Sequence, residues 1–320
     1  MSTLTRFAFT MGAAALFAGC GGSQPPIGTQ GAMPQSATAK ERVHRASESS
    51  GALIYATGGC GGTCVLSYPQ GKVVAQLSQY GGAPCSDAAG NVFIPTVGQV
   101  VEYQHGGTTP IATLSLPSKS AGTYNCSVDP NTNNLAVTSL ADSGLYVAVF
   151  ANESGTPTLY SPRIDGVYCG YDNAGNLFVS GNTSKGFPAI SELARGQSTF
   201  TPLSINGSLG AAAGQVQWDG SYITWQGRAI DREPASISRL TISGSTATVV
   251  STTSLKGKVN RSTLSWIYSG RVLMPYSTSR VRFSKIAIWP YPQGGKPKSI
   301  IKFDKFTSFQ GVTVSVAPSR

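Results

Sequence analysis

The sequence has few histidines and few acidic side chains, and it lacks common hydrolase motifs. Only His44 and His105 occur in 320 residues, and neither stands where an imidazole would be held beside a substrate by a partner. No Gly-x-Ser-x-Gly motif and no Ser/His/Asp set is apparent. No catalytic residue is therefore predicted.

The chain also lacks the features of a helical protein. Charged residues make up only 12% of the sequence, and no amphipathic helical pattern follows residue 50. Glycine (38) and proline (19) are abundant instead. This composition is typical of many short strands joined by turns, so the fold class predicted is all-β.

A single hydrophobic run lies at the amino terminus. It extends over Phe7–Phe17, too short to span a bilayer comfortably, and leads into Ala18-Gly19-Cys20-Gly21. This segment resembles a bacterial lipobox, in which small residues precede a cysteine that becomes diacylated, although Phe17 departs from the usual leucine. The resemblance implies a signal peptide over 1–19, lipidation of Cys20 and attachment to a membrane. An ordinary secretory signal cleaved nearby is the alternative.

Residues 20–50 and 51–320 differ sharply in composition. The first segment is rich in Ser, Gln, Pro, Gly, Ala and Thr and cannot bury a core, which predicts a flexible tether after the lipidated cysteine. Strand-like sequence begins at Gly51. The expected location is the cell envelope, with the folded domain held at the outer membrane or cell surface.

The folded domain is organised around a repeated hairpin. Cys85–Ile94 returns as Cys169–Val179, and a copy with a longer turn covers Cys126–Val137. Asp accepts hydrogen bonds from the backbone just after it, while Gly and Asn accept positive φ, so each copy predicts strand, tight turn and strand. The predicted structural turn residues are Asp87, Gly90, Asn91, Asp129, Asp172, Gly175, Asn176 and Asp219.

The spacing of the hairpins predicts a propeller. Asp87, Asp129 and Asp172 are separated by 42 and 43 residues, and a period near 40 with about four strands per unit is typical of propeller blades. Degenerate copies follow at 216–225 and 264–274. We expect a six-bladed β-propeller of four-stranded blades, closed by the C-terminal strand 309–316 pairing with 53–56 of the first blade.

The hairpin motif Asp-x-x-Gly-Asn-apolar-Phe-apolar resembles that of NHL-repeat and gluconolactonase-like six-bladed propellers. The whole chain, lipobox included, resembles a group of bacterial lipoproteins with that architecture. Gluconolactonase-like enzymes hold a divalent cation in the channel through carboxylate and Asn ligands. Here the repeated acids are assigned to turns, and Glu102, Glu192 and Asp165 match no ligand pattern. No metal ligand or cofactor is predicted, and a metal-dependent lactonase-like hydrolase is the alternative function.

The cysteines after Cys20 fall into two groups. Cys60 and Cys64 bracket a short turn, and an exported protein can oxidise such a pair, with two free thiols as the alternative. Cys85, Cys126 and Cys169 occupy the same position in three successive repeats. Packing as small buried hydrophobes is the preferred interpretation for these three, with a disulfide or a metal site as the alternatives.

Basic residues are concentrated in the last third of the chain. Residues 46–220 carry 5 basic and 10 acidic side chains, whereas residues 221–320 carry 15 basic and 3 acidic ones. The positive electrostatic potential of so many basic side chains attracts anions. This predicts a non-catalytic binding scaffold for an anionic envelope polymer or protein. Nucleic acid is not expected for an exported protein without a recognition motif, and a monomer is expected. The predicted anion-binding face comprises Arg228, Arg232, Arg239, Lys256, Lys258, Arg261, Arg280, Arg282 and Lys285.

Overall fold

The computed structural model describes residues 51–117, 120–141, 144–210, 212–230, 233–279, 284–303 and 308–318. All of them lie in one unit, Val43–Arg320. Cys20, the predicted signal peptide and the predicted tether lie outside the described residues. Within the described part, none of the helical structure is long and apolar enough to cross a membrane.

Three of the sheets have four strands each. The first contains β25 (Gly311–Ser315), β1 (Leu53–Gly59), β2 (Gly62–Ser67) and β3 (Val73–Leu77). The second contains β4 (Cys85–Ser86), β5 (Val92–Thr96), β6 (Gln99–Tyr103) and β7 (Pro110–Ser115). The third contains β8 (Ser120–Val128), β9 (Leu135–Ala141), β10 (Gly144–Phe150) and β11 (Thr158–Tyr160), with the 3-10 turn η1 (Ala151–Glu153) after β10.

The other two sheets are larger. One has the order β12 (Asp165–Tyr171), β13 (Leu177–Asn182), β14 (Pro188–Leu193), β15 (Thr201–Asn206), β19 (Thr246–Leu255), β18 (Ala235–Ser243), β17 (Ile223–Gly227) and β16 (Ala213–Trp218). The last contains β20 (Arg261–Ser262), β22 (Arg271–Ser277), β23 (Lys285–Pro290) and β24 (Ser299–Lys302), and β21 (Trp266–Tyr268) also pairs with β22. Hydrogen bonding thus groups the described strands into five sheets.

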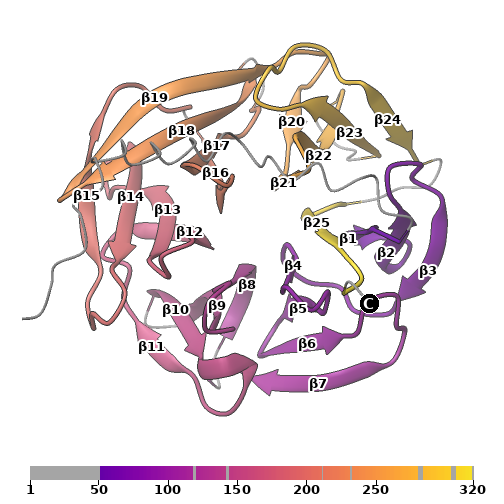
Figure 1. Cartoon of the computed structure of the whole chain (residues 1–320), viewed down its shortest axis with the longest axis horizontal. Coiled ribbons are helices and arrows are strands. Elements are labelled where there is room, and N and C mark those ends of the chain that lie inside the picture. The colour runs from indigo at the N-terminus through magenta and orange to yellow at the C-terminus, as the bar shows by residue number, and fades with distance from the viewer. Residues whose placement is uncertain are drawn as a thin grey trace, which may run out of the picture. The chain divides into compact units, whose positions relative to one another are not determined.

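The sheets stand around a common centre as an all-β propeller (Figure 1). Neighbouring strands within them are antiparallel, except that β15 and β19 pair in parallel through Ser204–Asn206 and Thr246–Thr248. The C-terminal strand β25 pairs with β1, from Leu53 opposite Ser315 to Thr57 opposite Gly311. The predicted pairing of the last strand with the first blade is therefore confirmed.

The hydrophobic core lies between neighbouring sheets, as expected for a propeller. Between the second and third sheets, Cys85 and Phe93 pack with Cys126 and Leu135 in one buried cluster. Within the eight-stranded sheet, Trp225 from one half belongs to a cluster that also contains Phe178 and Ile190 from the other half. Apolar side chains are therefore buried mainly where one sheet packs against the next.

The hairpin turns that begin at Asp87, Asp129, Asp172 and Asp219 gather at one end of the propeller, which we call the turn end. Asn131 Nδ2 donates to the carbonyl of Asn173 at 2.9 Å, so neighbouring turns touch. Ser315 Oγ at the end of β25 donates to the carbonyl of Gly90 at 2.5 Å. The alternate strand connections, such as 97–98 and 183–187, lie at the opposite end because the strands run antiparallel.

Candidate functional site

The repeated aspartates close their own hairpins. Asp87 accepts hydrogen bonds from the backbone N and the Nδ2 of Asn91, at 2.7 and 3.0 Å. Asp172 makes the same two contacts with Asn176, both at 2.8 Å. The glycine before each Asn has positive φ, 86° at Gly90 and 84° at Gly175. The carboxylates therefore fix the turns, as the repeated motif predicts.

Asp129 and Asp219 show two variations of this turn. Asp129 accepts from the backbone N of Asn131 at 3.0 Å and from Thr132 Oγ1 at 2.5 Å. Asp219 accepts from the backbone N of Ser221 and of Tyr222, at 2.9 and 2.8 Å. All four predicted turn acids thus bind their own turn.

Asp219 also has a second role, which changes the assignment of Arg239. Arg239 Nε lies 2.7 Å from Asp219 Oδ2, and the Tyr291 hydroxyl donates to the same oxygen at 2.6 Å. The guanidinium carbon lies 5.2 Å from the ring centroid of Tyr222 and 5.0 Å from that of Tyr291. Burial raises the pKa of Tyr291, which keeps the hydroxyl protonated as a donor. Arg239, a residue of the predicted anion-binding face, therefore has a counter-ion in Asp219.

Two acids that matched no sequence pattern occupy equivalent positions. Glu102 on β6 pairs with Phe93, and Glu192 on β14 pairs with Phe178. Burial raises the pKa of both carboxyls, with a further contribution from the turn aspartate of the same sheet, Asp87 or Asp172. The turn aspartate and this glutamate thus form an acidic pair in each of the two sheets. Asp165 lies at the start of β12, apart from both pairs.

Glu153 is a further acid at the turn end. It ends η1 with φ of 54°, after Asn152 with φ of 47°, and its Oε1 is buried without a described hydrogen-bond partner. Burial, followed by the charges of Asp87 and Glu102, raises the pKa of Glu153 to about 7. Carboxyl groups from the second and third sheets therefore interact across the space between those sheets.

A cleft of about 420 Å³ opens at the turn end between the two halves of the eight-stranded sheet. One wall comes from the β12–β13 hairpin and β14, and the other comes from the Asp219 turn and β18. Both acidic and aromatic residues line the cleft. They are Asp172, Phe178, Glu192, Trp218 and Tyr222.

The sheet that contains β20 to β24 carries basic side chains at the end opposite to the turn end. Lys285 on β23 is paired with Tyr276 on one side and with Lys302 on the other. The Lys285 ammonium lies 5.9 Å from the Tyr276 ring centroid. Arg261 begins the neighbouring β20 and bridges to Ile230, two residues after Arg228. We call Arg261, Lys285 and Lys302 the basic row. The Arg228 guanidinium instead contacts the eight-stranded sheet, where its carbon lies 5.5 Å from the Tyr168 ring centroid and its Nε donates to the carbonyl of Ala213 at 2.6 Å.

Of the other residues of the predicted anion-binding face, the structure describes only some. Lys256 and Lys258 are exposed on the connection between β19 and β20. Arg232, Arg280 and Arg282 lie outside the described residues. The place of Lys302 opposite Lys285 depends on a strand register that the sequence does not display.

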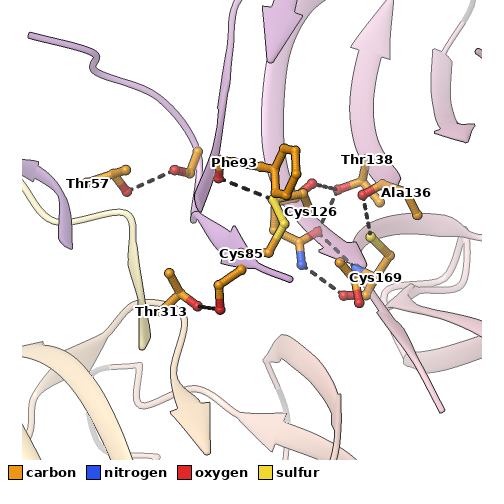
Figure 2. The surroundings of a disulfide bond; sticks show 12 residues. Thr57, Cys85, Phe93, Cys126, Ala136, Thr138, Cys169 and Thr313 are labelled. Carbon is orange, nitrogen blue, oxygen red and sulfur yellow. Dashed lines mark hydrogen bonds between the residues drawn. A yellow bond between two sulfur atoms is a disulfide. The ribbon is translucent and has the colours of Figure 1, made fainter. Parts of the chain in front are cut away.

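Two disulfides and one free thiol account for the cysteines of the described part, and Figure 2 shows the Cys85–Cys126 bond with the free Cys169 nearby. Cys60 is bonded to Cys64, the pair that the sequence singled out. Cys85 on β4 is bonded to Cys126 on β8, with 5.5 Å between the Cα atoms. Preferring simple core packing for this pair was therefore wrong, since both residues are buried and bonded. Cys169 is free and buried, and burial raises the pKa of its thiol.

Metal-ligating residues do not converge in the described part of the chain. Among those residues, no group of three or more His, Cys, Asp or Glu side chains is placed to hold a metal ion. The four turn aspartates instead bind turn backbone.

No protein-family model matches the sequence, and no curated protein matches it either. Solved structures match the fold. A chain of a nidogen/laminin complex aligns with a TM-score of 0.64 at 11% identity, covering 84% of this chain and 100% of that one. A TolB-like protein from Agrobacterium tumefaciens gives 0.56 at 14%, covering 84% and 99%. The β-propeller domain of Cps50 (Swd1) from Myceliophteria thermophila gives 0.52 at 11%, covering 79% and 84%. These similarities show a β-propeller fold.

Proposed function

We propose that this protein is an exported lipoprotein whose propeller is a non-catalytic binding scaffold for an anionic partner in the cell envelope. In this proposal, residues 1–19 form the signal peptide, Cys20 carries the lipid, and 20–50 tether the propeller of residues 51–320 to the outer membrane or cell surface. The protein acts as a monomer, needs no cofactor and does not bind nucleic acid.

The propeller in this proposal has six blades. The eight-stranded sheet consists of two antiparallel four-stranded halves whose strands pair with each other only at β15 and β19. The innermost strands contact one another in a closed cycle, in the order β4, β8, β12, β16, β21, β25 and back to β4. Six inner strands in one cycle support six blades, with the two halves of the large sheet as separate blades.

The pairing of Lys285 with Lys302 is the observation that carries the proposed anionic partner. Like charges directly opposite on neighbouring strands destabilise a sheet. Among the described residues the only ion pair joins Arg239 to Asp219, so neither lysine has a described counter-ion. A bound anion would relieve this repulsion, and Arg261 would extend the contact along the basic row.

The geometry of the turn end supports a binding role over catalysis. The aspartates that the repeat supplies accept two or more hydrogen bonds each from their own hairpins. A carboxylate committed to its own turn is a structural element of the fold. The residues that the proposed function uses therefore lie away from these turns.

Binding of polyphosphate by the full-length chain in detergent tests the proposed partner. We expect saturable binding that weakens strongly between about 50 and about 300 mM salt, because anion contacts release counter-ions. The variant Lys285→Ala/Lys302→Ala should lose most of the affinity and part of the salt dependence. The matched control Lys296→Ala/Lys298→Ala changes exposed lysines on the connection after β23 in the same sheet. Equal losses in both variants would reject the basic row as the site.

The anchor is tested separately by metabolic labelling with palmitate. The wild-type chain should be labelled, and Cys20→Ala should abolish labelling and release the protein from membranes. Labelling that persists in Cys20→Ala would contradict lipidation at Cys20, while leaving the polyphosphate experiment valid.

A further inference from the structure

We propose that the cleft between the two halves of the eight-stranded sheet binds a small organic cation bearing an alkylammonium group. This site is separate from the basic row and has the opposite charge preference. It lies at the turn end, where the β12–β13 hairpin faces the Asp219 turn and β18.

The size of the cleft suits a small molecule. Its volume of about 420 Å³ falls in the range of ligand pockets, which is roughly 300–1,000 Å³. The buried Phe178 forms part of its lining, and the half-buried Trp218 and Tyr222 line it from the facing half. Aromatic faces of this kind attract cations through the ring quadrupole and bind alkyl groups by apolar contact.

The charge of the cleft selects a cation. Asp172 and Glu192 both line it, and no Lys, Arg or His does. The Asp172 carboxylate is held by Asn176 and by the backbone N of Ala174, whereas no described hydrogen bond reaches the Glu192 carboxylate. Glu192 therefore offers an open carboxylate to a ligand, and a bound cation would offset the repulsion between the two acids.

Two arginines lie near the cleft but outside its lining. Arg239 contacts the Tyr222 ring, but its charge is balanced by Asp219. Arg195 donates its backbone N to Asn176 Oδ1, and its side chain is exposed. Neither arginine belongs to the lining, so the two carboxylates and the three aromatic rings define the chemistry of the site.

The second sheet provides a matched control. Asp87, Asn91, Phe93 and Glu102 repeat the arrangement of Asp172, Asn176, Phe178 and Glu192. The Trp218 and Tyr222 wall is specific to the cleft in the eight-stranded sheet. A substitution at Glu102 therefore removes an equivalent acid while leaving the cleft itself intact.

Titration with choline, compared with its uncharged isostere 3,3-dimethyl-1-butanol and with glucose, tests the proposal on the full-length chain. Calorimetry and tryptophan fluorescence report binding, with sodium chloride added to keep ionic strength equal. We expect saturable binding of choline, and at least tenfold weaker binding of the isostere. Glu192→Gln should weaken choline binding about tenfold, as expected when one charged contact is lost. Glu102→Gln should leave choline binding unchanged.

A second variant keeps the test decisive if Glu192→Gln does not fold. Thr241 is exposed and lines the cleft, so Thr241→Lys should place a competing ammonium there without disturbing the core, and choline binding should be lost. Equal affinity for choline and the isostere, stronger binding of glucose, or no saturable binding of choline would each overturn the proposal.

Discussion

The side chain of Asn125 and the backbone of Cys169 exchange two hydrogen bonds across neighbouring sheets. Asn125 Nδ2 donates to the carbonyl of Cys169 at 3.0 Å, and the backbone N of Cys169 donates to Asn125 Oδ1 at 2.9 Å. The carboxamide therefore acts like a peptide group of an extra strand between β8 and β12. Thr138 Oγ1 also donates to Asn125 Oδ1 at 2.8 Å, so this fully buried amide is well satisfied.

The same device recurs between β16 and β21. Gln217 Nε2 donates to the carbonyl of Ile267 at 2.9 Å and Gln217 Oε1 accepts from its backbone N at 2.7 Å. Gln226 likewise bonds to the backbone of Thr263 and Ser265. Carboxamides thus join the sheets near the centre of the propeller, where the backbones of neighbouring sheets do not form a continuous ladder.

Removing the Asn125 carboxamide should destabilise the protein. In Asn125→Ala the backbone N of Cys169 loses a buried acceptor, and we expect the free energy of unfolding to fall by about 2–4 kcal/mol. Urea denaturation followed by tryptophan fluorescence measures this. The control Asn173→Ala, at an exposed turn residue, should change it by less than about 0.5 kcal/mol. Similar values for the two variants would contradict the bridging role.

The two disulfides should contribute unequally to stability. Cys85 and Cys126 are 41 residues apart, whereas Cys60 and Cys64 are 4 apart. Because loop-closure entropy grows with loop length, Cys85→Ala/Cys126→Ala should cost about 4 kcal/mol and Cys60→Ala/Cys64→Ala about 2 kcal/mol. Melting of both variants with and without reductant checks the order, and a larger loss from the shorter loop would refute it.

Asp219 should matter more than the other turn aspartates. Asp219→Asn keeps an acceptor for the turn but leaves Arg239, whose side chain is 23% exposed, without its counter-ion. We expect a loss of about 2–4 kcal/mol, against roughly 1 kcal/mol for Asp87→Asn. The double variant Asp219→Asn/Arg239→Met should recover part of the loss. No recovery in a double-mutant cycle would mean that the turn, and not the ion pair, dominates.

Glu153 should make stability fall as pH rises. Its folded-state pKa is raised from 4.5 to about 7, so between these values the folded protein holds a proton that the unfolded chain releases. The free energy of unfolding contributed by this group is therefore lost as pH rises through that window. Because the side chain is half-buried, we expect at most about 1–2 kcal/mol. Denaturation at several pH values should show a flatter profile in Glu153→Gln.

Much of the fold was predictable because local chemistry fixes it. The Asp87 and Asp172 turns depend on residues four apart, and the lone strand at 309–316 had no other partner than the first blade. The joining of β15 to β19 was not predictable, because it depends on the long β18 and β19 extending far enough to meet the neighbouring half.

The candidate sites were less accessible from sequence because they depend on register. Glu102 follows Asp87 by 15 residues, while Glu192 follows Asp172 by 20, so unequal connections hid their equivalence. Each glutamate pairs with the phenylalanine of the hairpin in its own sheet. Aligning the repeats on this pair would have revealed that the two glutamates are equivalent. Charge counting placed Arg239 with the other basic residues, since nothing local shows that it pairs with Asp219.

The parallel pairing of β15 with β19 also limits how the protein can associate. Outer strands of a sheet present unpaired backbone groups on which another extended chain can add, and such edges favour aggregation. Over Ser204–Asn206 and Thr246–Thr248, two such edges cover each other. The outer strands β3, β7, β11 and β24 have no such cover among the described strands. An added strand can therefore pair with β3, β7, β11 or β24, but not with the paired segments of β15 and β19 in the sheet that holds the cleft.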